Sequence, residues 1–287
     1  MKSNNPIFSR SEEFSRPTTN QYGNQTYAGG APTVGFGEPG SAYPAGSPTH
    51  TTGQGAGLMT IDSVVQKTAI ALGVVMLTAA ATWIMTPDIA NLEAAGTLYA
   101  ALTIGGLGAF ALSMVNSFKR VISPPLVLLF CVFEGVALGA FSKVIDASFS
   151  TADSGNLVVQ AVLGTFAAFA GTLAAYKVFD IKVGNKFRMF VIAAVFGMVG
   201  LSIMELILGM FSSSLGLFGF GALGMVFALV GLVLGVFMLI LDFDFVEQGI
   251  ANQLPEAESW RAAFAITVAL VWIYTNLLRL LAMFNSD

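Results

Sequence analysis

The chain has 287 residues, of which 55% are hydrophobic and only 10% are charged, and its net charge is −4. A soluble domain carries about 25% charged residues, so this composition predicts a membrane protein. The sequence contains no basic cluster of the kind that follows a phosphate backbone, which argues against a nucleic-acid partner. With a single cysteine, Cys131, and a single histidine, His50, an intrachain disulfide is excluded, and a zinc site or a histidine-based triad is disfavoured.

The first 58 residues are rich in glycine, proline, serine, threonine and asparagine and contain almost no aliphatic clusters. Such a segment cannot bury enough apolar surface to offset its ordering entropy, so we expect residues 1–58 to form a disordered cytoplasmic tail. It lacks the basic start and apolar core of a cleavable signal peptide, so we expect it to stay attached. The membrane domain, residues 59–287, begins where Thr60 can cap a helix and Asp62 lies in the first turn.

Seven apolar runs in this domain are long enough to cross a bilayer as helices. The sequence therefore predicts an all-α membrane protein, a seven-transmembrane helix bundle with a disordered N-terminal tail. The predicted spans are residues 64–85, 96–115, 125–144, 157–176, 187–211, 215–241 and 261–284.

Lysine and arginine concentrate in the loops that follow the second and fourth spans, and cytoplasmic loops carry this excess in membrane proteins. We therefore expect a multi-pass protein of the cell inner membrane with a cytoplasmic N-terminus and an external C-terminus. The basic residues of these two loops are Lys119, Arg120, Lys177, Lys182, Lys186 and Arg188.

Small residues recur four positions apart in three of the spans, a spacing that lets helix backbones approach closely. We interpret these pairs as helix-packing positions with no further function. They are Gly135 with Gly139, Gly164 with Ala168, and Gly231 with Gly235.

Three acids, Asp242, Asp244 and Glu247, close the sixth span. Acids near lipid depth are costly and usually lie against a pathway, a cation or water. On a continuing helix Asp244, Glu247 and Gln248 share one face, whereas Asp242 points about 200° away from Asp244. The alternative is that all three acids have left the membrane and begin a hydrated cytoplasmic loop.

Three of the other charged residues within the predicted spans are considered for a role. Glu134 is near the middle of the third span, where a carboxylate should be protonated or face a polar interior, so it has either a pathway role or a structural inter-helix hydrogen bond. The same two readings apply to Glu205 in the fifth span. Arg279, near the end of the last span, is expected to extend toward the membrane interface.

Motifs of hydrolytic or phosphoryl-transfer enzymes are absent, so we expect no enzymatic activity and no cofactor. The acids do not form an EF-hand either, because the sixth position counted from Asp242 is Glu247 rather than glycine. A hard cation such as calcium would nevertheless suit a mouth lined by Asp244 and Glu247.

Four segments resemble the Bax inhibitor-1 family, the transmembrane Bax-inhibitor-motif proteins, in its long-tailed bacterial form. The likeness covers about residues 60–284 and excludes the tail. The segments are Lys119-Arg120 with Ser123-Pro124-Pro125, Glu134-Gly135 with Leu138-Gly139, residues 244–248, and residues 277–281.

The resemblance implies a seven-helix bundle around a central helix, acting as a pH-sensitive calcium leak. It also implies two aspartates that share a proton and a basic residue that latches onto the first of them. The first aspartate corresponds to Asp244, with Asp242 as the fallback, and the latch to Arg120 or Lys119. The second aspartate falls on Ala269, so Glu247 or Glu134 would have to replace it.

The leading hypothesis is therefore a pH-sensitive calcium or cation leak channel of the bacterial inner membrane, gated by acids at the end of the sixth span. Its partners would be the lipid bilayer and calcium ions. The alternative is a non-transporting membrane regulator that binds a membrane protease or a stress-response partner. An intramembrane enzyme is disfavoured because no nucleophile and base pair is visible.

Overall fold

The computed structural model describes residues 18–19, 25–26, 57–88, 92–150, 156–211 and 214–285. The chain divides into two compact units, residues 1–53 and 54–287. In the first unit, β1 (Thr18–Thr19) pairs with β2 (Gln25–Thr26) in an antiparallel ladder. The predicted disordered tail otherwise falls almost wholly outside the described residues.

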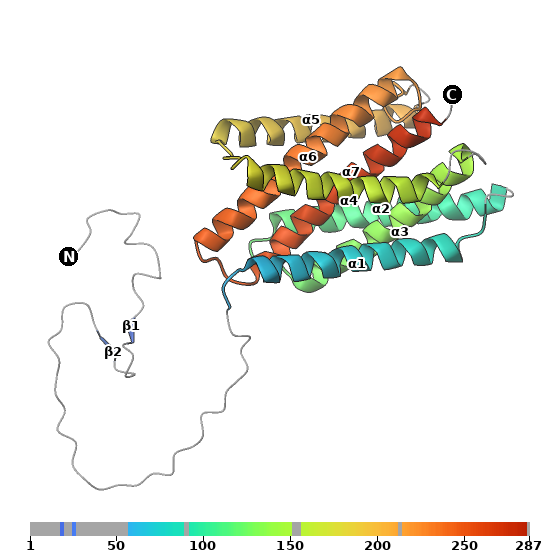
Figure 1. The fold of residues 1–287 in the computed structure, drawn as a ribbon. Helices are drawn as coiled ribbons and strands as arrows, with labels where there is room; N and C mark the ends of the chain where they lie inside the picture. The colour runs from blue at the N-terminus through green and yellow to red at the C-terminus, as the bar shows by residue number, and fades with distance from the viewer. Residues whose placement is uncertain are drawn as a thin grey trace, which may run out of the picture. The chain divides into compact units, whose positions relative to one another are not determined.

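The described part of the second unit contains seven helices, all long and apolar enough to cross a membrane, which confirms the predicted fold class. Figure 1 shows α6 and α7 running at an angle to α1 and α4. The helices are α1 (Ile61–Met85), α2 (Leu92–Phe118), α3 (Pro124–Phe149), α4 (Leu157–Val178), α5 (Asn185–Met210), α6 (Ala222–Ala251) and α7 (Glu258–Phe284).

Local sequence signals fix several helix starts. Thr60 caps α1 with Ser63 in a reciprocal capping box, as the sequence predicted for Thr60. Prolines occupy the first turn of α3, where a missing N–H costs nothing. The Asn156 side chain accepts a hydrogen bond from the Val159 N–H at the start of α4.

α7 is the central helix of the bundle. It packs against α1, α3, α4 and α6, whereas α2 packs mainly on α3 and α5 mainly on α6. In α7, 61% of the most apolar stretch is buried, compared with at most 44% in any other helix. The central helix that the family resemblance implied is therefore present, and residues on α7 are the ones that can face an internal site.

Close helix packing occurs at the predicted glycines. A Cβ atom at Gly135 would lie 2.5 Å from the Val75 carbonyl oxygen of α1, and one at Gly235 would lie 2.6 Å from Cγ1 of Ile273 in α7. Gly139 likewise faces α1, and Gly231 faces Asn276 of α7. These contacts confirm the helix-packing interpretation and set the register of α3 on α1 and of α6 on α7.

The sixth helix differs from its predicted bounds of 215–241, because it begins at Ala222 and continues to Ala251. The apolar residues that precede it are interrupted by glycines, and Gly216 has a φ of +82°, a conformation that stops helical continuation. At the other end, the acidic residues after Leu241 continue the helix instead of leaving it. The acids therefore lie on a helix rather than in a loop.

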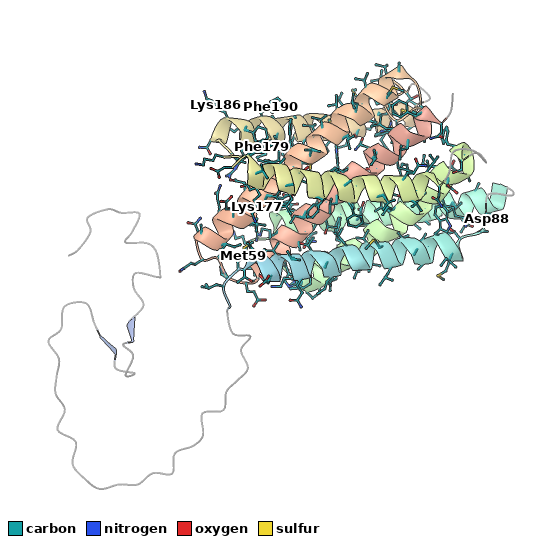
Figure 2. All side chains as sticks on the ribbon, in the orientation of Figure 1. Met59, Asp88, Lys177, Phe179, Lys186 and Phe190 are labelled. Atoms are coloured by element: carbon teal, nitrogen blue, oxygen red, sulfur yellow. The ribbon has the colours of Figure 1, made fainter. Side chains whose placement is uncertain are left out.

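The two ends of the bundle differ in charge. Figure 2 shows Lys177 and Lys186 at the end where Met59 precedes α1, and Asp88 at the opposite end. We call the first the basic end. There the residues before α1 are held to the α6–α7 connection, since the Met59 N–H donates to the Leu254 carbonyl. Lys67 in α1 forms an ion pair with Glu256 of the same connection. The predicted grouping of basic loops is thus borne out as an arrangement in space.

Candidate functional site

Asp244 is the best-connected acid at the end of α6. Its side chain is buried, and its Oδ2 atom accepts hydrogen bonds from Arg188 Nη2 at 2.8 Å and from Gln248 Nε2 at 2.7 Å. Arg188 lies in the first turn of α5, so the ion pair joins α5 to α6. Gln248 lies one turn further along α6, as the predicted spacing requires. The hydrated-loop alternative is therefore wrong for Asp244.

Glu247 occupies the same face of α6 but is exposed. It accepts a hydrogen bond of 2.6 Å from the Tyr176 hydroxyl, near the end of α4. The Tyr176 ring also packs on the ring of Phe243, with centroids 5.8 Å apart. The end of α6 is thus tied to α4 through Glu247 and to α5 through Asp244.

Asp242 has a different environment from the other two acids. Its Oδ2 atom is buried and has no hydrogen-bond partner within the described part of the chain. Asp242 lies two helical turns after Gly235, so it occupies the face of α6 that packs on α7. An unpaired buried oxygen is costly, which makes Asp242 a second candidate for function alongside Asp244.

The two residues predicted to latch Asp244 lie elsewhere. Lys119 and Arg120 are both exposed, and neither bonds to Asp244. The backbone carbonyl of Arg120 instead accepts a hydrogen bond from Arg261 Nη2 at the start of α7. In this conformation the cationic partner of Asp244 is Arg188, which the sequence analysis used only for orientation.

A second polar site lies inside the bundle, in a cavity of about 300 Å³ that we call the Glu134 cavity. Glu134 on α3 and Arg279 on α7 both line it, but no ion pair joins them. Within the described residues Glu134 has neither a hydrogen bond nor an ion pair, so the inter-helix hydrogen bond considered for it is not formed here. The other polar lining residues are Ser202, Thr275 and Asn276.

Arg279 is buried, which corrects the expectation that it extends to the membrane interface. It donates a hydrogen bond of 2.8 Å to the Leu217 carbonyl in the α5–α6 connection, and its guanidinium carbon lies 5.7 Å from the centroid of the Phe218 ring. Glu205 is bound to the same connection, where its carboxylate accepts hydrogen bonds from three backbone N–H groups. These hydrogen bonds run to the α5–α6 connection rather than to another helix, so they differ from the inter-helix hydrogen bond considered for Glu205.

An apolar layer separates the acids of α6 from the Glu134 cavity. It consists of Leu239 on α6 and of Ile266, Ala269, Leu270 and Ile273 on α7, all of them buried in one cluster. Leu239 lies one turn before Asp242 on α6, and Ile273 lies one turn before the cavity residue Asn276 on α7. Ala269, the position of the missing second aspartate, is thus part of this layer and is fully buried.

The acids do not form a metal centre in this conformation. The described residues contain no group of three or more histidine, cysteine, aspartate or glutamate side chains that could hold a metal ion. Asp244 is bound to a cation and an amide, and Glu247 is bound to a hydroxyl group. At Asp244 a cation would therefore compete with Arg188 for the carboxylate.

Sequence reasoning missed Lys143, a buried lysine on α3. Its Nζ atom donates to the carbonyls of Trp83 and Thr86 at 3.0 and 2.5 Å and lies 3.0 Å from Asp88. These contacts satisfy carbonyl groups at the end of α1. This role requires a lysine near the end of one span to face the end of another span. Which residues face each other depends on helix register, so the role could not be predicted from the sequence.

Comparison with known protein families matches nearly the whole chain. The family described as Bax inhibitor 1 like matches residues 5–286, so the match reaches further toward the N-terminus than the 60–284 expected from the motifs. A comparison with curated proteins finds no match to the chain.

Proposed function

Because this chain belongs to the Bax inhibitor 1 like family, we propose that it is a cation leak channel of the bacterial inner membrane, with calcium as the transported ion. In this proposal the basic end and the N-terminus face the cytoplasm, in agreement with the excess of lysine and arginine there. The acids at the end of α6 form the cytoplasmic mouth.

The observation that carries the proposal is the stacking of two polar sites along α6 and α7. Asp242 and Asp244 lie toward the basic end, Glu134 lies in a cavity further in, and the apolar layer lies between them. Buried carboxylates inside a membrane protein usually mark an ion or proton pathway, since each one is costly to place there. The apolar layer closes this pathway in the conformation described, because it offers a cation no oxygen ligand.

The Arg188–Asp244 ion pair supports a gating role for the end of α6. α5 packs mainly against α6, so this contact is one of the few that hold the start of α5 on the bundle. Breaking the ion pair would release the start of α5 from α6. Separation of α5 from α6 would then loosen the packing of α6 on the apolar layer.

The proposed link to pH acts on the ion pair between Arg188 and Asp244. The two side chains attract each other by charge, so any change that removes the charge of either partner weakens the contact. With Ala269 in place of a second aspartate, the proton-sharing pair implied by the family is absent at that position. We therefore expect a gradual dependence of flux on pH, with flux rising as pH falls.

The test is ion flux through the purified protein in liposomes, with calcium compared against potassium and protons between about pH 5 and 8. Asp244→Asn removes the charge that holds Arg188, so we expect higher calcium flux at neutral pH and a flattened pH response. Glu134→Gln should lower flux at every pH while leaving the shape of the response intact. Glu258→Gln is the control, because it removes a carboxylate in the first turn of α7 that pairs with Arg261 outside the proposed path.

Two outcomes would overturn parts of this proposal. If Asp244→Asn matched the unmodified protein at every pH while Glu134→Gln abolished the response, the pH sensor would lie in α3. If no cation crossed the membrane under any condition, the leak would be rejected in favour of a regulator that binds a membrane protein partner.

A further inference from the structure

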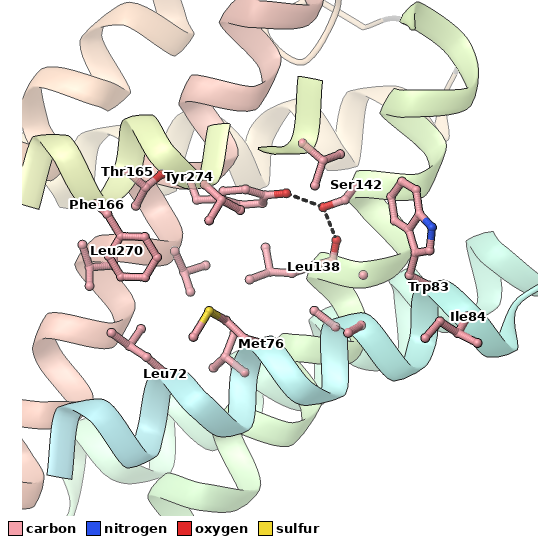
Figure 3. Close-up of a pocket in the computed structure, with 17 residues that line it drawn as sticks. Leu72, Met76, Trp83, Ile84, Leu138, Ser142, Thr165, Phe166, Leu270 and Tyr274 are labelled. Carbon is pink, nitrogen blue, oxygen red and sulfur yellow. Dashed lines mark hydrogen bonds between the residues drawn. The ribbon is translucent and has the colours of Figure 1, made fainter. Parts of the chain in front are cut away.

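A large apolar cavity of about 460 Å³ lies among α1, α3, α4 and α7, and its lining shares only Leu138 with the Glu134 cavity. Figure 3 shows Leu72, Met76 and Trp83 of α1 on one side and Thr165 and Phe166 of α4 on another. Its volume is within the range of about 300–1,000 Å³ that holds small-molecule ligands. Protein interiors are close-packed, so we expect a cavity of this size to hold a bound molecule.

The hydroxyl groups at this cavity are already paired within the protein. The Tyr274 hydroxyl lies 2.6 Å from the Ser142 hydroxyl, which donates to the Leu138 carbonyl (Figure 3). Thr165 donates to the Ala161 carbonyl. Apart from the Trp83 indole, the walls therefore present only apolar surface. An ion or a polar molecule would gain no hydrogen bond from these walls, whereas a hydrocarbon chain has no hydrogen bonds to lose on entering the cavity.

The cavity is open sideways, between α1 and α4. Both helices pack on α7 but make little contact with each other. Met76, Ile84 and Phe166 line the cavity and are also exposed, by 48%, 80% and 41%. Since these helices cross a membrane, the opening faces lipid acyl chains rather than water.

The length and depth of the cavity match one leaflet. Its lining on α1 runs from Leu72 to Ile84, and Leu72 lies eleven residues, or about 16 Å, from Trp83. Half of a hydrocarbon core is about 15 Å thick. Because α1 ends at Met85, the cavity extends from the membrane interface at that end to about the midplane.

Trp83 gives the mouth of the cavity a polar group. No atom of the described residues accepts a hydrogen bond from its indole N–H, and tryptophan at this depth places its N–H among lipid head groups. Its backbone carbonyl is held by Lys143, which fixes this end of α1 against α3. The indole can therefore donate to an ester or phosphate oxygen of a lipid whose chain lies in the cavity.

We propose that this cavity binds one acyl chain of a membrane phospholipid from the leaflet opposite the basic end, with the head group beside Trp83. The chain would fill the space between α1 and α4 and complete the packing of both helices on α7. This site does not depend on ion transport, and its test needs no flux.

The test uses two adjacent alanines of α1. Both alanines are exposed, but Ala80 lines the cavity and Ala81 does not. Ala80→Phe places a ring in the chain-binding space and Ala81→Phe places the same ring in bulk lipid. Native mass spectrometry of the purified protein after detergent washing measures the fraction that retains a phospholipid, and thermal unfolding verifies that both variants are folded.

We expect one retained phospholipid on the unmodified protein and on Ala81→Phe, and a retained fraction lower by about tenfold on Ala80→Phe, which corresponds to the loss of burial of two methylene groups. Added phospholipid with palmitoyl chains should raise the unfolding temperature, and phospholipid with hexanoyl chains should not. Equal retention by the two variants, retention of detergent or free fatty acid alone, or stabilisation independent of chain length would each overturn the proposal.

Discussion

The strength of the Arg188–Asp244 ion pair can be predicted from its burial. The two side chains are 43% and 10% exposed and their charged atoms lie 2.8 Å apart. Unit charges about 4 Å apart attract by about 1 kcal/mol in water and about 4 kcal/mol at an effective dielectric constant of about 20. Because Arg188 is partly in contact with solvent and Asp244 loses its hydration, we expect a net coupling free energy of about 1–2 kcal/mol.

A double-mutant cycle with Arg188→Gln, Asp244→Asn and the combined variant measures this coupling through thermal unfolding in detergent. Each 1 kcal/mol corresponds to a shift of about 2–4 °C for a domain of this size. Two other ion pairs of the same protein calibrate the result. Lys67–Glu256 has nearly the same exposure, 11% and 45%, and should couple equally.

The third pair, Lys182–Asp180, is 86% and 81% exposed and should show a coupling near zero. If the exposed pair coupled as strongly as the other two, burial would not set the strength of these contacts. If Arg188 and Asp244 showed no coupling while Lys67 and Glu256 did, Arg188 would not hold Asp244, and the proposed gate would lose its basis.

Three further predictions follow from the fold. Lys143→Met keeps an apolar side chain but leaves two carbonyls at the end of α1 without their donor, so we expect a loss of about 1–3 kcal/mol, read as a lower unfolding temperature. A chain that begins at Gly57 should unfold at the same temperature as the full chain. A chain that begins at Ile61 should unfold at a lower temperature, because it lacks the buried residue Met59. An equal loss of stability in both shortened chains would show that the tail packs on the bundle. A reporter active only outside the cytoplasm, fused to Asp287, should be active, and an inactive fusion would contradict the proposed orientation.

The helices of this protein could be predicted because their signal is local. Each span is an apolar run of sufficient length, and most predicted limits lie within a few residues of the structure. The sixth helix is the exception, since an apolar run that contains several glycines is not helical from its start. The acidic residues after Leu241 remain helical because the intrahelical hydrogen bonds do not depend on side-chain polarity.

The candidate site was only partly predictable, for a different reason. The shared face of Asp244 and Gln248 was predicted from their spacing on one helix, and the structure adds a hydrogen bond between them. The identity of the cationic partner depends on which of several basic residues folds onto α6, and the structure selects Arg188 instead of Arg120 or Lys119. The shared cavity of Glu134 and Arg279 depends on the register of α3 and α7, which no single-helix pattern encodes.

The segment before α1 is hydrogen-bonded to the α6–α7 connection, so a force on this segment acts on that connection. The Met59 N–H bonds to the Leu254 carbonyl, and the Glu256 N–H bonds to the Gly57 carbonyl. A force applied to the chain before Gly57 therefore loads the α6–α7 connection before it loads α1. Leu254 follows the helix that carries Asp244, so tension on the N-terminal segment is transmitted to the end of α6 along a short path of backbone hydrogen bonds.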